Sequence, residues 1–342
     1  MRVLVTGAAG FIGSFLSQAL LDSGAEVVGL DNLNDYYDPA LKRARLGHLT
    51  DREGFRFQQL DLADHAALQK VFDGERFDTV VHLAAQAGVR YSLENPFAYA
   101  RSNLLGHLSV LECVRHAAPR PFLIYASSSS VYGNDSVAPF SESERADRPV
   151  SLYAATKRSD ELMSESYASL YGMHQVGLRF FTVYGPWGRP DMAYWLFADR
   201  ILSGRPIKVF NQGNLRRDFT WIDDIVDGIV RIVTKGVQDD RPVHRVYNIG
   251  NNKPERLLDF ISALEKALGR EARKEFLPMQ PGDVYETAAD ISAISRDYGF
   301  APTTSIDAGL QRFADWFKGY RSGENMPWRG SHKLSVAETS RG

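Results

Sequence analysis

Short apolar runs alternate with longer amphipathic stretches through the first half of the chain. Runs rich in valine, leucine and isoleucine are typical of parallel strands, because helices cover both faces of such a sheet. Helical patterns separate the runs, most clearly at residues 11–23, 97–117 and 151–171. The pattern therefore predicts an α/β fold built on a doubly wound parallel sheet. Strands are expected at residues 2–6, 25–30, 55–60, 78–83, 121–127 and 175–181.

After about residue 182 the predicted elements become shorter, and the turn-rich segment 185–190 marks the change. This part of the chain predicts a smaller C-terminal α/β lobe over the carboxyl edge of the sheet. We expect a first domain at residues 1–181, a substrate lobe over most of 182–322 from which the chain can cross back, and a polar tail at 323–342. Strands are predicted near residues 208–210, 217–221 and 246–249, and helices near 192–203, 222–235, 255–268 and 305–320.

The composition narrows the classes of protein to consider. Of 342 residues, 44% are hydrophobic and 24% are charged, as in globular proteins. The formal net charge of −2 argues against attraction to nucleic acid or to an anionic membrane. The single cysteine, Cys113, excludes an internal disulfide and suits a reducing compartment. Since no apolar run is long enough to span a bilayer, we expect a soluble, cytoplasmic protein. We also expect no metal site.

A glycine-rich turn at residues 6–13 (Thr-Gly-Ala-Ala-Gly-Phe-Ile-Gly) joins the first strand to the first helix. Gly7, Gly10 and Gly13 allow a tight turn, close approach of a pyrophosphate, and packing of helix on strand. Asp31, at the end of the second strand, can bind ribose hydroxyls and would repel a 2′-phosphate, so NAD is predicted rather than NADP. The expected NAD site also includes Phe11, Ile12, Asn32, Asp61, Leu62, Leu83, Ala84 and Ala85. Asp61 has an alternative role as a helix N-cap.

A candidate general base lies in the helix predicted at residues 151–171. Tyr153 and Lys157 are four residues apart, so they share one helix face. A free tyrosine ionises near pKa 10, and a base that works near pH 7 needs about 4 kcal/mol of help, which a lysine cation and a positively charged nicotinamide can supply. Ser128 and Ser130 alternate along a strand end, so we expect them to face one side and relay a proton. Ser129 completes this candidate catalytic group.

These motifs resemble those of the extended short-chain dehydrogenase/reductase family, and in particular its sugar-nucleotide epimerases. The resemblance covers about residues 1–320 and is strongest to the branch of UDP-glucuronate 4-epimerases. Four segments carry it: residues 31–39, 84–92, 179–192 and 217–220.

The resemblance implies that NAD stays tightly bound and is regenerated in each cycle. Tyr153 would take the proton of the sugar 4-hydroxyl while hydride leaves C4, and hydride would return to the opposite face of a transient 4-keto sugar. The product from UDP-glucuronic acid would be UDP-galacturonic acid. The resemblance also implies a homodimer, in which the helices at 97–117 and 151–171 pair into a four-helix bundle.

Arg189 is the residue expected to bind the sugar carboxylate, because a guanidinium and a carboxylate form two parallel hydrogen bonds. Holding the carboxylate out of line with the C4 carbonyl would suppress loss of CO₂ from the β-keto acid. The alternative is a loop arginine paired with Asp191. Further contacts implied by the resemblance are Thr182 (sugar), Arg217 (diphosphate), Asp283 (uridine ribose), Arg90 (pocket wall) and Asn103 (near the cofactor). A cap or a surface ion pair is the alternative for Thr182, Arg217 and Asp283.

Rival functions remain open on the sequence alone. A UDP-glucuronate decarboxylase starts from the same substrate and oxidises it in the same way, and a UDP-galactose 4-epimerase would leave Arg189 without a carboxylate. A dTDP-glucose 4,6-dehydratase needs an acid–base pair of carboxylates where this chain has Ser129 and Ser130. A protein outside catalysis, a regulatory scaffold that binds NAD, would not need Tyr153 and Lys157 beside the serines.

Overall fold

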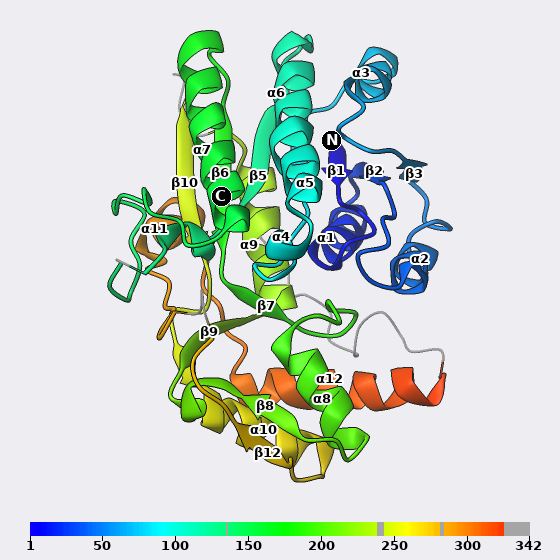
Figure 1. The fold of residues 1–342 in the computed structure, drawn as a ribbon. Coiled ribbons are helices and arrows are strands. Elements are labelled where there is room, and N and C mark those ends of the chain that lie inside the picture. Colours follow the sequence, from blue (N-terminus) through cyan, green and yellow to red (C-terminus); the bar gives the residue numbers. More distant parts are fainter. Residues whose placement is uncertain (135, 238–242, 281–283, 325–342) are drawn as a thin grey trace, which may run out of the picture.

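The computed structural model describes residues 1–134, 136–237, 243–280 and 284–324, and a seven-stranded parallel sheet forms its centre (Figure 1). The strand order is β3-β2-β1-β4-β5-β6-β10, which is the order of a Rossmann fold with one added strand. The six strands predicted in the first half are confirmed to within about one residue at most ends. The strands are β1 (Arg2–Thr6), β2 (Glu26–Asp31), β3 (Phe55–Gln59), β4 (Thr79–His82), β5 (Phe122–Ser128), β6 (Gln175–Phe180) and β10 (His244–Ile249).

Helices cover both faces of this sheet. On one face α1 (Phe11–Asp22) packs against α9 (Ile222–Lys235), and on the other α6 (Gly106–His116) packs between α3 (His65–Gly74) and α7 (Leu152–Tyr171). The central strands β1, β4 and β5 are almost wholly buried, which explains their uninterrupted apolar runs, whereas β3 at the edge of the sheet is mostly exposed. The sheet therefore presents only its edges and the ends of its strands to ligands.

The helix predicted at residues 97–117 is a helical stretch in three parts. It consists of α5 (Pro96–Tyr99), the π-helix η1 (Ala100–Leu105) and α6. A π-turn widens the helix by one residue, and the apolar pattern of the sequence runs through it without a break. The widened turn places Asn103 inside the protein, with 1% of its surface exposed. The single turn α4 (Tyr91–Glu94) comes before α5 in the chain.

The smaller lobe lies beyond the carboxyl ends of the central strands (Figure 1). It holds a three-stranded sheet, β11-β9-β7, and a two-stranded sheet, β12-β8. The chain crosses back from this lobe to the central sheet through β10, the strand expected near residues 246–249. The elements of the lobe are β7 (Thr182–Tyr184), α8 (Ala193–Leu202), β8 (Ile207–Val209), β9 (Arg216–Trp221), β11 (Pro254–Arg256), α10 (Leu257–Leu268), β12 (Lys274–Phe276) and α12 (Ile306–Ser322).

Several elements were not predicted from the sequence, namely α2 (Pro39–Gly47), α3, α11 (Ser292–Tyr298), β7, β11 and β12. All are short, and residues 39–47 carry a strongly polar pattern in which only four side chains are buried. A short polar helix of this kind is stabilised by tertiary contacts rather than by its own periodicity.

An aromatic cluster joins the lobe to the loop after β7. The rings of Trp187 and Trp195 both lie 5.3 Å from that of Trp316 on α12, and Tyr320 stacks on Trp316. Aromatic pairs at these distances add to the burial of their large surfaces. The cluster fixes the loop that carries Arg189.

Within the described ranges, every helix is too short or too polar to cross a lipid bilayer. The same residues contain no group of three or more histidine, cysteine, aspartate or glutamate side chains placed to hold a metal ion. Of the polar tail expected at 323–342, residues 325–342 lie outside the described residues.

Candidate active site

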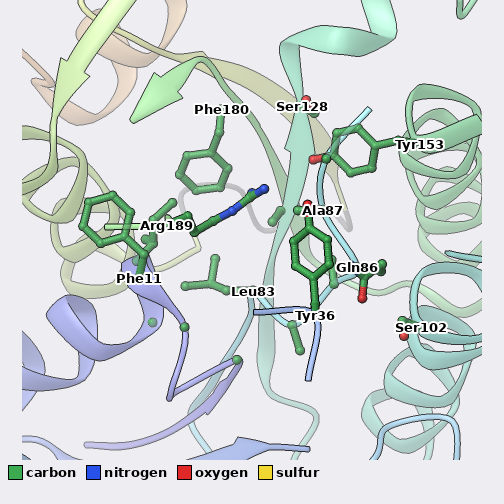
Figure 2. Close-up of a pocket in the computed structure, with 18 of the residues that line it drawn as sticks. Phe11, Tyr36, Leu83, Gln86, Ala87, Ser102, Ser128, Tyr153, Phe180 and Arg189 are labelled. Atoms are coloured by element: carbon green, nitrogen blue, oxygen red, sulfur yellow. The ribbon is translucent and has the colours of Figure 1, made fainter. Parts of the chain in front are cut away.

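A cavity of about 430 Å³ opens where β1 and β4 end (Figure 2). The direction of the strand order reverses between these two strands, and doubly wound sheets bind ligands at such a point. Most of the residues predicted for the cofactor, for catalysis or for the substrate line this one cavity. They are Gly7, Gly10, Phe11, Ile12, Gly13, Asp31, Asn32, Asp61, Leu62, Leu83, Ala84, Ala85, Ser128, Ser129, Ser130, Tyr153, Lys157, Thr182 and Arg189.

The glycines of the turn at residues 6–13 pack more closely than side chains would allow. A Cβ atom on Gly13 would lie 2.1 Å from the carbonyl oxygen of Gly7, and one on Gly7 would lie 2.8 Å from the backbone nitrogen of Ala84. Helix α1 begins after Gly10 with no side-chain cap and no acidic residue in its first turn. Its first N–H groups have no acceptor within the helix, so the turn offers them to an anion in the cavity.

Asp31 ends β2 at the rim of the cavity, with 8% of its surface exposed. Its carboxylate accepts hydrogen bonds from the backbone nitrogens of Ala9 (3.2 Å) and Leu33 (2.8 Å). These bonds fix the carboxylate beside the glycine turn, and each oxygen keeps a lone pair that can accept from a ribose hydroxyl. This is the position predicted for the ribose-binding acid.

Asp61 also lines the cavity, and the structure tests its alternative role as a helix N-cap. The N-cap of α3 is Asp64, whose side chain accepts from the backbone nitrogen of Ala67. Asp61 instead accepts from the Ala63 backbone nitrogen (3.0 Å) and pairs with Arg101. The alternative of a helix N-cap is therefore wrong for Asp61.

Tyr153 and Lys157 lie one turn apart near the start of α7, as predicted. The Ser151 side chain caps this helix and so sets where the turn that holds Tyr153 begins. The ring of Tyr153 packs edge-on against Tyr99, with centroids 6.0 Å apart. Figure 2 shows its hydroxyl directed into the cavity on the side of Ser128.

The Lys157 ammonium group is buried and has two partners. Its Nζ donates to the backbone oxygen of Ala126 (2.9 Å) and to Oδ2 of Asp160 (3.1 Å). The Asp160 side chain is fully buried, and burial raises the pKa of its carboxyl group to about 6 despite the lysine cation beside it. Asp160 is a residue that the sequence reasoning missed, although the spacing of three residues places it on the Lys157 face.

The serines meet in a different way from the one expected. Strand β5 ends at Ser128, and Ser129–Tyr132 forms the short 3₁₀-helix η2, so the alternation predicted for Ser128 and Ser130 is wrong. The Ser128 side chain caps η2 and accepts from both the backbone nitrogen (3.2 Å) and the hydroxyl (2.8 Å) of Ser130. The tight turn therefore joins the two hydroxyls directly.

A buried ion pair between α7 and β6 lies next to this end of β5 and stabilises it. Glu161 of α7 accepts two hydrogen bonds of 2.8 Å from Arg179 of β6 and one of 2.6 Å from the Ser127 hydroxyl. Burial alone would raise the pKa of Glu161, but the Arg179 guanidinium holds it below the usual value. The pair locks α7 to β5 and β6, and so fixes Tyr153 relative to the serines.

The Arg189 guanidinium reaches into the cavity, and its own chain supplies a partner. Nε and Nη2 donate to the two carboxylate oxygens of Asp191, at 3.0 and 2.5 Å. The Tyr36 hydroxyl also donates to Asp191, at 3.0 Å. The pairing with Asp191 that the sequence left open is thus present, and Arg189 lines the cavity at the same time.

Three of the predicted residues lie outside the cavity lining. Asn103 sits behind its wall and hydrogen-bonds the backbone nitrogen (2.8 Å) and oxygen (3.1 Å) of Gln86. Arg90 is hydrogen-bonded to Gln280, and Nη1 of Arg217 donates to the backbone oxygen of Tyr285. Asp283 lies outside the described residues.

Sequence reasoning missed several residues that line the cavity, among them Tyr36, Gln86, Ser102, Phe180 and Met192. Tyr36 lies inside the segment 31–39 that carried the family resemblance, so its position was the available signal. Gln86 follows Ala84 and Ala85 directly in the segment 84–92, and its side-chain nitrogen is buried without a hydrogen-bond partner in the described structure.

The comparisons with known proteins agree with this geometry. A family model described as the NAD dependent epimerase/dehydratase family matches residues 3–250. The chain belongs to the NAD-dependent epimerase/dehydratase family. Its cofactor is therefore NAD, which fits the crowded glycine turn, the uncapped α1 terminus and the fixed Asp31 carboxylate.

Individual relatives come from several branches of life. The chain is 49% identical to the CapI protein of Staphylococcus aureus, covering 94% of this chain and 99% of that one. It is 47% identical to UDP-glucuronate 4-epimerase 3 of Arabidopsis thaliana, over 94% and 77% of the two chains. The crystal structure of the UDP-glucuronic acid 4-epimerase of Bacillus cereus with UDP-glucuronic acid and NAD superposes with a TM-score of 0.86. The two chains are 38% identical, and the match covers 94% of this chain and 100% of that one.

Proposed function

We propose that this protein epimerises C4 of UDP-glucuronic acid, giving UDP-galacturonic acid through a transient 4-keto sugar. One observation carries the proposal: Tyr153, Lys157, the serine pair and Arg189 line the same cavity as the glycine turn. A base for a sugar hydroxyl, a guanidinium for a carboxylate and an NAD site thus share one space. The relatives named as UDP-glucuronate 4-epimerases support the same substrate.

The residues of the chain divide the work of this reaction. NAD, when bound, supplies the acceptor for the C4 hydride and the donor that returns it. Tyr153 takes the proton of the 4-hydroxyl, and the Ser128–Ser130 pair can hold that hydroxyl or pass its proton on. Lys157 places a buried cation one helical turn from Tyr153, which favours the ionised phenol. The proton returns along the same path when the sugar is reduced.

Arg189 binds the C6 carboxylate in this proposal. Once C4 is oxidised, the carboxylate is β to a ketone, and such acids lose CO₂ when the breaking bond aligns with the carbonyl π system. A bidentate guanidinium anchors the carboxylate and so restrains the ring conformation about C4–C5, which sets the direction of the C5–C6 bond and keeps that bond out of alignment. Thr182, at the start of β7, lines the cavity and is placed to hydrogen-bond the sugar.

The deciding experiment incubates the purified protein with UDP-glucuronic acid in the absence of added NAD and separates the nucleotide sugars. UDP-galacturonic acid as the product supports substrate, reaction and retained cofactor together. A pentose product such as UDP-xylose would identify a decarboxylase instead, and turnover of UDP-glucose alone would identify an epimerase of neutral sugars. Tyr153→Phe is the matched control, and its rate should fall by at least a hundredfold.

A homodimer is part of the proposal. Exposed leucines lie along η1–α6 and α7, which pack side by side on one face of the sheet (Figure 1). Apolar stripes of this kind on two neighbouring helices suit pairing with the same stripes of a second copy. The residues are Leu105, Leu108, Leu162 and Leu170. We further propose a cytoplasmic location, which the free and buried thiol of Cys113 supports.

A further inference from the structure

Within the described ranges, the ion pair of Arg189 with Asp191 occupies one edge of its guanidinium group. Asp191 accepts from Nε and Nη2, which form the side edge of the planar group. Nη1 belongs to the terminal edge, and among the described residues Asp191 is the one carboxylate that pairs with Arg189. Figure 2 shows the terminal nitrogens pointing into the space framed by Phe180, Tyr153 and Ala87. A second carboxylate can therefore bind end-on without displacing the first.

The Asp191 carboxylate is itself held in place. Tyr36 donates to Oδ2 at 3.0 Å, and its ring packs against Tyr91 with centroids 4.7 Å apart. The Arg189 guanidinium lowers the pKa of Asp191 although burial opposes this, so the carboxylate stays ionised at neutral pH. A Cβ atom on Gly88 would lie 2.8 Å from the Tyr36 hydroxyl, and Gly88 has a φ of +106° that favours glycine.

We propose that Asp191 is a positioning residue that grips the side edge of Arg189 and so aims its terminal edge at the carboxylate of the substrate. The inference rests on the proposed function, since it assigns the determinant of uronic acid recognition at that site. Tyr36 anchors the Asp191 carboxylate in this arrangement, and Gly88 leaves room for the Tyr36 phenol. Without Asp191, the long arginine side chain would sample several rotamers, and the substrate would have to restrain it.

Binding and product measurements on four proteins test this inference: the wild type, Asp191→Ala, Arg189→Ala and the double variant. Dissociation constants for UDP-glucuronic acid and UDP-glucose come from calorimetry, and the sugar products are separated as above. Asp191→Ala should weaken UDP-glucuronic acid by about tenfold, leave UDP-glucose within about twofold, and raise the decarboxylated fraction. In the Arg189→Ala background, the same change should have no further effect, because Asp191 acts through Arg189.

Two further variants keep the test decisive. Tyr36→Phe keeps the ring and loses one donor, so it should weaken UDP-glucuronic acid by a smaller factor than Asp191→Ala does. Asp199→Ala removes another arginine-paired carboxylate, on α8 outside the cavity, and should leave the preference for the uronic acid unchanged.

The outcomes distinguish a failure of the proposed function from a failure of the role of Asp191. A wild-type protein that binds UDP-glucose as tightly as UDP-glucuronic acid overturns the proposed function. Two results would overturn the role of Asp191 alone, provided that the wild type prefers UDP-glucuronic acid. One is an Asp191→Ala variant that keeps this preference. The other is a double variant that binds UDP-glucuronic acid more weakly than Arg189→Ala does.

Discussion

Lys157 and Asp160 form a buried ion pair within one turn of α7, with Nζ and Oδ2 3.1 Å apart. The pair places a negative charge beside the cation on which Tyr153 depends. Since burial raises the pKa of Asp160 to about 6, the carboxyl group is ionised at pH 7.5 and becomes neutral as the pH falls below 6. The charge next to Lys157 therefore changes within the range in which enzymes are assayed.

From this pair we expect Asp160→Asn to shift the pH dependence of turnover. The variant keeps the shape and removes the carboxyl group that titrates beside Lys157, so the charge next to this lysine no longer changes with pH near pH 6. An inflection near pH 6 should be present in the wild type and absent from the variant. Rates of epimerisation from pH 5 to 9 check this, and superimposable profiles would contradict it.

The glycine turn predicts a selective loss of cofactor in Gly13→Ala. The added Cβ would lie 2.1 Å from the Gly7 carbonyl oxygen, so the turn must open and its contact with a pyrophosphate is lost. Gly47→Ala is the matched control, because a Cβ at Gly47 has no neighbour within 4 Å. We expect the first variant to be purified with less than about a tenth of the NAD of the wild type, a loss of about 1.4 kcal/mol or more. Equal NAD content in both variants would refute the expectation.

The Arg45 side chain connects the glycine turn on the cofactor side of the cavity with the loop before Arg189 on the substrate side. Its fully buried guanidinium donates to the backbone oxygens of Ala9 (3.1 Å), Trp187 (2.8 Å) and Gly188 (2.8 Å). Methionine would keep the volume and leave these oxygens unsatisfied, which should cost about 3–5 kcal/mol.

Urea unfolding of Arg45→Met measures this loss of stability. The control is Arg43→Met, since Arg43 is exposed on the same helix and its change should fall within about 0.5 kcal/mol. Similar midpoints for the two variants would show that the bridge contributes little.

The buried histidines predict a loss of stability in mild acid. Burial, and to a lesser degree the charge of Lys157, lowers the pKa of His82 to about 3, and burial holds the pKa of His107 well below its usual value. In the unfolded chain both take up a proton near pH 6.5, so the free energy of unfolding should fall below that pH by up to about 1.4 kcal/mol per unit for each. Asp160 acts in the opposite sense, because it is protonated in the folded state from about pH 6 downward while the unfolded group ionises near 3.9.

Denaturant unfolding at several values between pH 7.5 and 5 measures this slope. His107→Gln keeps a hydrogen-bonding group opposite Ser164, its partner at 2.9 Å, and should reduce the slope by about one proton. An unchanged slope in the variant would count against the assignment.

The proposed dimer predicts that Leu162→Glu yields monomers. Leu162 is 53% exposed on α7, and a buried carboxylate at the centre of an apolar interface is strongly unfavourable. Leu196→Glu on α8, where the leucine is 41% exposed, is the matched control and should leave the assembly unchanged. Light scattering after size-exclusion chromatography distinguishes the two results. A monomeric wild type would overturn this part of the proposal.

The sequence by itself determined the features that depend on local spacing. The glycine turn, Asp31 at the end of β2 and the Tyr153–Lys157 pair were all predicted, because strand and helix periodicity fix which neighbouring residues share a face or an end. The order of strands and helices was likewise enough to give a doubly wound parallel sheet. Where the local geometry was irregular, as at η2 and η1, the same reasoning failed, since a tight or widened turn leaves no mark on an apolar pattern.

Tertiary structure alone decided how segments far apart in the chain meet. Tyr36 and Asp191 are 155 residues apart, and Arg45 reaches Trp187 across 142 residues. Such contacts depend on where loops of irregular conformation are held by the sheet, the aromatic cluster of α12 and each other, and no periodicity encodes that. The burial of the Lys157–Asp160 pair has the same origin, because spacing brings the two charges together and only the packed core removes them from water.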